Sequence, residues 1–190
     1  MKTKNLLIAF AITALAQLFV PMKMIFVYNT TEKEGTVYHF KAEPVDPNDP
    51  FRGKYITLSY TMENLTVKDT AWESGKTVYI SLKKDKDSFA VADNVSADKP
   101  EKDTDYVSAE VFYYNKHDKN LRVTLPFNRY YMEESKAPEA EAAYREYTTS
   151  LKDFKPAYAV VAIKDGNAVL TDVIIDGMPI KEYVEKNKKK

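Results

Sequence analysis

DPNDPFRGKYITLSY, residues 46–60, places two Asp-Pro corners, an Arg-Gly turn and an alternating strand in one short stretch. Each proline fixes its own φ and pushes the preceding residue toward extended geometry, so the first half predicts a stiff, turn-rich corner. From Arg52 onward the pattern alternates, which places every second residue from Ile56 to Met62 on one face. The stretch therefore predicts a corner followed by a half-buried strand.

The rest of the chain adds more strands and one late helix. Alternating apolar residues predict strands over 36–41, 77–83, 89–92, 106–114, 121–125, 158–163 and 168–175. Asp165-Gly166 and Asp176-Gly177 are strong turn signals. Apolar residues at helical spacing over 137–151 predict one amphipathic helix. We therefore expect a mainly β (α+β) domain: a compact, largely antiparallel β sandwich or partly open barrel, with that helix near the C-terminus.

Polar residues predict the connections. Residues 29–35 are expected to form a short linker that ends in a turn at Gly35. Residues 64–75, which hold the lone Trp72, are expected to be a polar connection. Residues 83–105 are expected to be a surface loop apart from the short strand at 89–92.

The N-terminus carries a basic and then apolar segment that is typical of an export signal. Lys2 and Lys4 precede the apolar run from Leu6 to Val20, which resumes after Lys23. An uncleaved anchor would use about twenty residues to cross a bilayer, with the amino end inside and the domain outside. The alternative is cleavage after Ala-Leu-Ala at residue 16, which would release the domain. We expect a signal anchor or transmembrane segment over 1–28, an extracytoplasmic (periplasmic) β-rich domain over 29–184 and a basic tail over 185–190.

Composition excludes several functions. The chain has 28 Lys and Arg against 28 Asp and Glu, so net charge gives no reason to expect a nucleic-acid partner. It has no Cys, which excludes disulfides, thiolate metal sites and a cysteine nucleophile. The 14 Tyr and 9 Phe supply large side chains for a core that no disulfide reinforces.

Two stretches resemble the GDYXXLXY family of membrane-associated bacterial proteins. Residues 46–60 carry its Arg-Gly-x-Tyr-x-x-Leu-x-Tyr signature, with Lys54 where the family usually has Asp. Residues 125–134, LPFNRYYMEE, resemble the family's Arg-Tyr-Tyr-x-x-Glu region. The resemblance implies a fold, a membrane location and partners among multi-pass membrane proteins, but no reaction.

The two signatures also provide the candidate site. Its side chains are Asp46, Asp49, Arg52, Gly53 and Tyr55 from the first stretch and Arg129, Tyr130, Tyr131, Glu133 and Glu134 from the second. If the stretches meet, these residues line one rim that suits a protein, sugar or peptide ligand. Alternatively, the acids cap turns and the arginines brace the corners through ion pairs. The spacing of the acids does not match a calcium loop, and we expect neither a metal nor a cofactor.

The sequence favours a binding function over catalysis. It lacks Gly-x-Ser-x-Gly, His-Glu-x-x-His and a phosphate-binding glycine loop. We expect a membrane-anchored interaction or assembly module of the cell envelope, whose partner is a multi-pass membrane protein or another envelope protein. Two alternatives stay open: an envelope hydrolase loosely similar to membrane-anchored signal peptidases, and a sugar- or peptide-binding domain that uses the rim.

Overall fold

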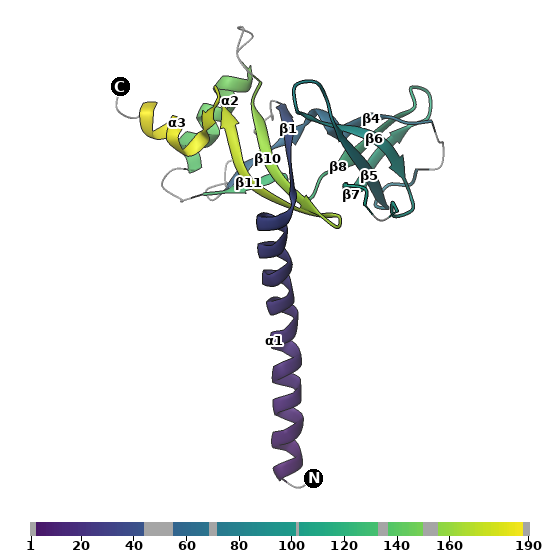
Figure 1. Cartoon of the computed structure of the whole chain (residues 1–190), viewed down its shortest axis with the longest axis vertical. Coiled ribbons are helices and arrows are strands. Elements are labelled where there is room, and N and C mark those ends of the chain that lie inside the picture. Colours follow the sequence, from purple (N-terminus) through teal and green to yellow (C-terminus); the bar gives the residue numbers. More distant parts are fainter. Residues whose placement is uncertain are drawn as a thin grey trace.

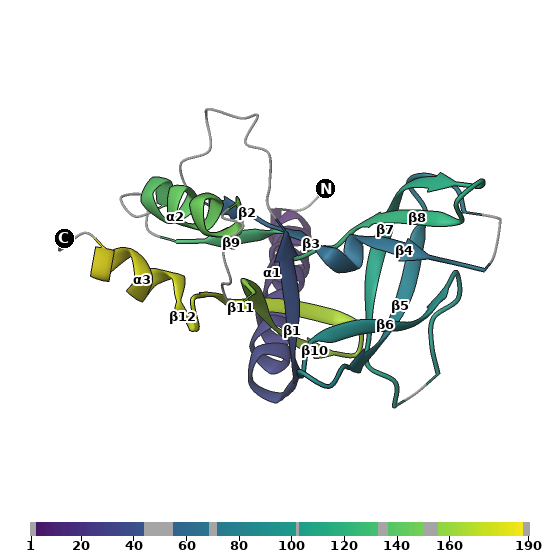
Figure 2. The same cartoon turned by 90° about the horizontal axis from the view of Figure 1, so that it is seen from above.

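A computed structural model describes residues 3–43, 55–68, 72–101, 103–132, 137–149 and 156–187 of the chain. A long N-terminal helix projects as a stalk from a β-rich domain (Figure 1). In the view from above, two shorter helices lie at one end of the domain, and the sheet built from residues 64–124 lies at the other end (Figure 2). The chain is therefore mainly β, as the sequence predicts.

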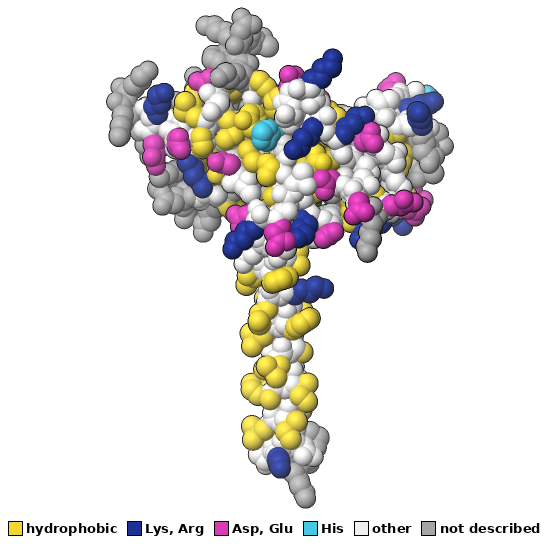
Figure 3. Space-filling model, viewed as in Figure 1, with side chains coloured by type: hydrophobic (Ala, Val, Ile, Leu, Met, Phe, Trp, Pro, Cys, Tyr) yellow, Lys and Arg dark blue, Asp and Glu magenta, His cyan; other side chains and the backbone are white. Residues whose placement is uncertain are grey.

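The stalk is helix α1, Thr3–Glu34. Its most apolar window has a mean hydropathy of 1.9 and none of that window is buried, so the helix is long and apolar enough to be a membrane anchor or a signal. Apolar side chains cover it over most of its length (Figure 3). The helix continues to Glu34, so the predicted linker over 29–35 is wrong. Thr31 explains the difference, because it is buried and the last turn packs on the sheet.

The described strands form three antiparallel sheets. The first has the order β12-β11-β10-β1-β3, built from Met178–Pro179, Asn167–Ile175, Tyr158–Lys164, Thr36–Glu43 and Ser59–Tyr60. The second pairs β2, Tyr55–Thr57, with β9, Arg129–Tyr131. The third has the order β4-β8-β7-β5-β6, built from Asn64–Thr66, Asn120–Thr124, Tyr106–Asn115, Thr77–Lys84 and Ala90–Ser96. The third sheet curls into a nearly closed barrel.

The predicted signature strand is present, but it divides at Leu58. Ile56, Leu58, Tyr60 and Met62 are all buried, which confirms the predicted face. Before Leu58 the chain pairs with β9, and after it the chain pairs with β1, where Ala42 faces Tyr60. The 3₁₀ helix η1, Thr61–Glu63, then leads into β4. This stretch therefore connects all three sheets.

Four of the predicted strands pair as two hairpins. Strands β7 and β8 pair around a polar turn, and β10 and β11 pair around Asp165-Gly166, whose φ angles are 52° and 80°. Two predicted loops are partly wrong, because β4 lies within the polar stretch 64–75 and β6 extends to Ser96 within 83–105. Both strands lie at edges of the third sheet, where one side of the strand faces solvent and polar residues are tolerated.

Helix α2, Ala137–Thr149, is the predicted amphipathic helix, and it buries Ala140, Tyr144 and Tyr147. A second short helix follows the last strand: α3, Ile180–Asn187. It buries Ile180 and Val184 and packs against α2, with Tyr183 and Tyr147 ring centres 6.4 Å apart. The predicted basic tail therefore begins inside a helix, and residues 188–190 lie outside the described part.

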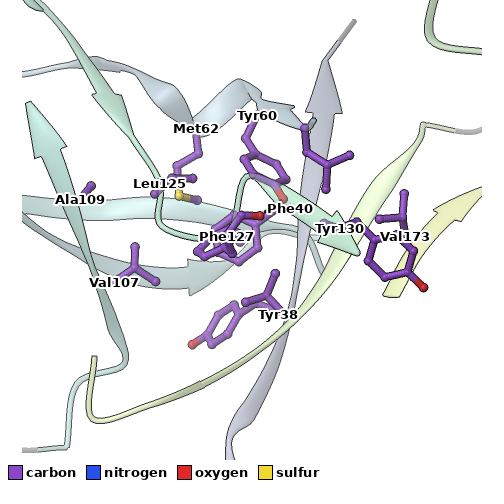
Figure 4. Close-up of a cluster of buried hydrophobic side chains, with 14 of the residues drawn as sticks. Tyr38, Phe40, Tyr60, Met62, Val107, Ala109, Leu125, Phe127, Tyr130 and Val173 are labelled. Carbon is purple, nitrogen blue, oxygen red and sulfur yellow. Dashed lines mark hydrogen bonds between the residues drawn. The ribbon is translucent and has the colours of Figure 1, made fainter. Parts of the chain in front are cut away.

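One hydrophobic core runs through the domain. Its centre is an aromatic cluster of Phe40, Tyr60 and Phe127 (Figure 4). The ring centres of Phe40 and Phe127 are 4.8 Å apart, and those of Tyr60 and Phe127 are 5.3 Å apart. The Tyr60 hydroxyl donates a hydrogen bond to the Phe127 carbonyl at 2.9 Å. This cluster holds the signature strand against the first sheet and against the segment that leads to β9.

Candidate interaction surface

The two signature stretches meet in the fold as the paired strands β2 and β9. Tyr55 faces Tyr131, Ile56 faces Tyr130, and Thr57 faces Arg129. The backbone amide of Leu58 also donates to the Asn128 carbonyl at 2.9 Å, which extends the contact by one residue. Residues far apart in the sequence therefore share one short ribbon.

Three signature side chains gather on the outer face of this ribbon: Tyr55, Arg129 and Tyr131, which we name the signature patch. The Tyr55 and Tyr131 ring centres are 5.5 Å apart. The Arg129 guanidinium carbon lies 5.1 Å from the centre of the Tyr55 ring, a cation–π distance. Tyr55 is half-buried, Arg129 is exposed, and Tyr131 is 63% exposed. The patch thus offers aromatic surface and a positive charge to solvent.

Tyr130 points the other way, into the core. It is buried, and its hydroxyl donates to the Asp172 carboxylate at 3.0 Å. Burial, followed by the nearby negative charge of Asp172, raises the pKa of the Tyr130 phenol well above its ordinary value. The Lys181 ammonium lies 5.4 Å from the centre of the Tyr130 ring. Tyr130 therefore ties β9 to β11 and α3, so we leave it out of the signature patch.

The backbone that carries the patch is held firmly at the turn after β3. The Ser59 hydroxyl donates to the Glu63 carboxylate at 2.8 Å, and the Tyr60 amide donates to the same oxygen at 3.4 Å. The Tyr144 hydroxyl donates to the Glu43 carbonyl at 2.8 Å and so joins α2 to β1. These contacts fix the strands that lie beside the patch.

The rest of the predicted rim lies outside the described residues: Asp46, Asp49, Arg52, Gly53, Glu133 and Glu134. Of the ten predicted residues, the structure thus brings Tyr55, Arg129 and Tyr131 together on the surface and places Tyr130 beneath them. Among the residues that the structure describes, no group of three or more His, Cys, Asp and Glu could hold a metal ion.

The junction between α1 and the domain is a feature that the sequence did not indicate. The Gly35 amide donates to the Thr31 carbonyl at 2.9 Å, and Glu34 forms an ion pair with Lys164. A Cβ atom at Gly35 would lie 2.9 Å from the Ile163 backbone nitrogen, so only glycine allows this approach. The helix and the sheet are therefore joined without a flexible linker.

A groove of about 700 Å³ opens where α1 leaves the domain. Phe19, Val20, Met24 and Val27 line its helix side, and Pro126 and the turn that contains Gly166 line its domain side. If α1 crosses a bilayer, this groove lies near the membrane surface.

A family model described as GDYXXLXY protein matches residues 17–173, which is most of the chain. No curated protein and no solved structure matches.

Proposed function

The chain belongs to the GDYXXLXY protein family, and on that premise we propose that it is a membrane-anchored interaction module of the cell envelope. The signature patch binds a second membrane or envelope protein, and α1 holds the domain beside that partner. The observation that carries the proposal is the pairing of β2 with β9, which gathers Tyr55, Arg129 and Tyr131 on one exposed face.

The composition of the patch supports protein binding. Tyr and Arg are enriched among the residues that dominate protein interfaces, because they combine a large apolar surface with a polar end. Tyr131 is 63% exposed, so much of its ring is free to be covered by a partner. The Tyr55 ring packs beside the Tyr131 ring, and the Arg129 guanidinium packs over Tyr55, so contacts within the patch restrict the motion of its side chains and lower the entropy cost of binding.

The anchor supports a partner in the same membrane. Because Gly35 packs on the β10 backbone and Glu34 pairs with Lys164, the domain keeps a fixed position relative to α1. A domain held in this way meets membrane neighbours at high local concentration. Lys2 and Lys4 precede the apolar run, which favours an amino end inside and a domain on the extracytoplasmic side.

Site-specific photo-cross-linking tests the proposal. A photoreactive phenylalanine analogue replaces Tyr131 in the full-length protein in native membranes, and a second variant carries it at Tyr113. Tyr113 is a matched control, because it is 60% exposed and lies on the third sheet. We expect one adduct of defined mass from position 131 and none from position 113. Equal adducts from both positions, or none from 131, would contradict the proposal.

A further inference from the structure

Among the residues that the structure describes, the third sheet leaves two strand edges unpaired, at β4 and β6. Neither strand contains Pro or Lys, two residues that commonly protect an exposed edge. The pairing of β6 with β5 is interrupted once, by a register shift at Asp93. From β4 through β8, β7 and β5 to β6 there are four pairings of neighbouring strands, and all four are antiparallel. Because each antiparallel pairing reverses the direction and their number is even, β4 and β6 run in the same direction.

A gap separates these two edges, and we name it the seam. It consists of two hollows of about 340 and 230 Å³ that share Leu65 of β4 and Ala92 of β6. Val67 and Val95 line the first hollow, and Met62 lines the second. The walls of the seam therefore mix apolar side chains with polar and charged ones, and a strand edge lies on each side.

The seam is closed at one end by β1. There Ala42 pairs with Tyr60 of β3, whereas His39 forms a bridge to Phe89, just before β6 begins. Lys41, which lies between these two contacts, lines the smaller hollow and forms an ion pair with Asp85 at 3.7 Å. The edges of β4 and β6 therefore separate as they run away from β1, and the seam is open at the end that is far from β1.

An unpaired donor lies at the larger hollow. Trp72 lines it, and the indole Nε1 of this residue is buried without a hydrogen-bond partner in the described part of the chain. A buried donor without an acceptor costs about 1–3 kcal/mol. The nitrogen itself is not exposed to the hollow, so a peptide carbonyl in the seam would pair with it only after the indole shifts.

We propose that the seam binds an extended peptide segment of a partner protein as an added strand. Because β4 and β6 run in the same direction, one strand of the opposite direction pairs antiparallel with both and closes the barrel. The lining of the seam on β6 runs from Ala90 to Val95, which matches about six residues or roughly 20 Å of extended chain.

The lining also defines the chemistry of this segment. Side chains that point into the seam meet Leu65, Val67 and Ala92, so alternate residues are small or apolar, and those between them are polar. Lys68 and Asp93 lie on the larger hollow with opposite charges, so no net charge is selected. The seam is separate from the signature patch, and its proposal does not depend on the function of that patch.

The lone tryptophan provides the assay. Trp72 is the only Trp in the chain, so its fluorescence reports from the seam. Full-length protein in detergent micelles is titrated with a pool of acetylated heptapeptides in which Ala, Val, Leu or Ile alternates with Thr or Lys. A second pool has the same sequences with N-methyl groups on alternate backbone amides, which removes the donors on one edge of the peptide.

We expect a saturable shift of Trp72 emission with the first pool and none with the second. Ala92→Arg should weaken binding by about tenfold or more, whereas Thr124→Arg, which adds the same charge on exposed β8, should not. The proposal is overturned by no saturable shift, by equal shifts from both pools, or by an Ala92→Arg protein that folds and binds normally. It is also overturned if the peptide-free protein is a dimer that Ala92→Arg converts to a monomer, since a second copy would then fill the seam.

Discussion

The Arg129 guanidinium carbon lies 5.1 Å from the centre of the Tyr55 ring, although each residue comes from a different signature stretch. The contact follows from the register of β2 and β9, in which Thr57 faces Arg129 and Tyr55 faces Tyr131. Arg129 therefore lies diagonally across from Tyr55, a spacing that long side chains and aromatic rings can bridge. This geometry makes the two stretches one surface, and the proposed function depends on it.

The inward side of the same ribbon should contribute to stability. Tyr130→Phe removes the hydrogen bond to the Asp172 carboxylate and should lower the free energy of unfolding by about 1–2 kcal/mol. Tyr131→Phe is the control, because Tyr131 is 63% exposed, and it should change stability by less than about 0.5 kcal/mol. Urea unfolding of the full-length protein measures both values. Equal losses in the two variants would show that the assignment of inner and outer faces is wrong.

Gly35 should control the rigidity of the junction. In Gly35→Ala, the new methyl group would lie 2.4 Å from the Thr31 carbonyl oxygen and 2.9 Å from the Ile163 nitrogen, so the last turn of α1 must move away from β10. We expect faster amide hydrogen exchange at residues 31–35 and 163–164. Gly75→Ala is a control for general destabilisation: no atom lies within 4 Å of its added methyl group, but its φ of 79° strains an alanine, so this variant should lower stability without changing exchange at the junction. Unchanged exchange at the junction in Gly35→Ala would argue against the tight attachment.

His39 should make stability depend on pH. Burial, and then the nearby charge of Lys84, lowers the pKa of the His39 imidazole below its ordinary value of 6.5. As the pH falls below about 6.5, His39 gains a proton more readily in the unfolded chain than in the folded domain, so stability is lost. The loss should end once the pH is below the pKa of His39 in the folded domain.

Two variants isolate this effect. His39→Phe keeps a ring against Tyr158, whose ring centre is 4.8 Å away, and removes the titrating group. Its stability should fall less between pH 7.5 and 5.5 than that of the wild type, and Lys84→Gln should give an intermediate decrease. Urea unfolding at the two pH values measures the difference. Identical decreases in wild type and His39→Phe would exclude His39 as the cause.

Labelling of single cysteines tests the orientation in the membrane. The chain has no Cys, so each introduced thiol is unique. Thr124 is exposed on β8, and Thr3 lies at the start of α1. A membrane-impermeant maleimide added to intact cells should label Thr124→Cys, and it should label Thr3→Cys only after the membrane is permeabilised. The reverse pattern would place the domain in the cytoplasm. A domain that is labelled at Thr124→Cys, while Thr3→Cys stays unlabelled even after permeabilisation, would indicate that the N-terminal segment is cleaved off.

Much of the fold was predictable because its signals are local. Alternation from Ile56 to Met62 identified the buried face correctly, and Asp165-Gly166 identified a hairpin turn whose φ angles are both positive. The helical spacing of Ala140, Tyr144 and Tyr147 likewise predicted which side of α2 is buried.

The errors arise where contacts distant in sequence decide the structure. The change of partner at Leu58 depends on where β1 and β9 lie, which no pattern within the strand encodes. The polar end of α1 stays helical because Thr31 and Glu34 meet the first sheet. Helix α3 had a weak local signal, since Ile180 and Val184 are four residues apart and both are buried.

The candidate site was predictable in part. The chemistry of Tyr55, Arg129 and Tyr131 was evident from the sequence, but their proximity depends on a strand register that only the fold reveals. Tyr130 was expected on the rim and is buried instead, because alternation along β9 turns it opposite to its neighbours. Trp72 gave no signal at all, since its place at the seam depends on β4 and β6.

Co-purification from native membranes after gentle solubilisation shows whether the signature patch holds a partner protein. Full-length wild-type protein is compared with Arg129→Ala and with Arg122→Ala, a matched control whose guanidinium carbon lies 5.6 Å from the Phe112 ring on the third sheet. We expect a stoichiometric protein partner with the wild type and with Arg122→Ala, and loss of that partner with a folded Arg129→Ala. Recovery of the wild type without a partner, or of the same partner with all three proteins, would contradict it.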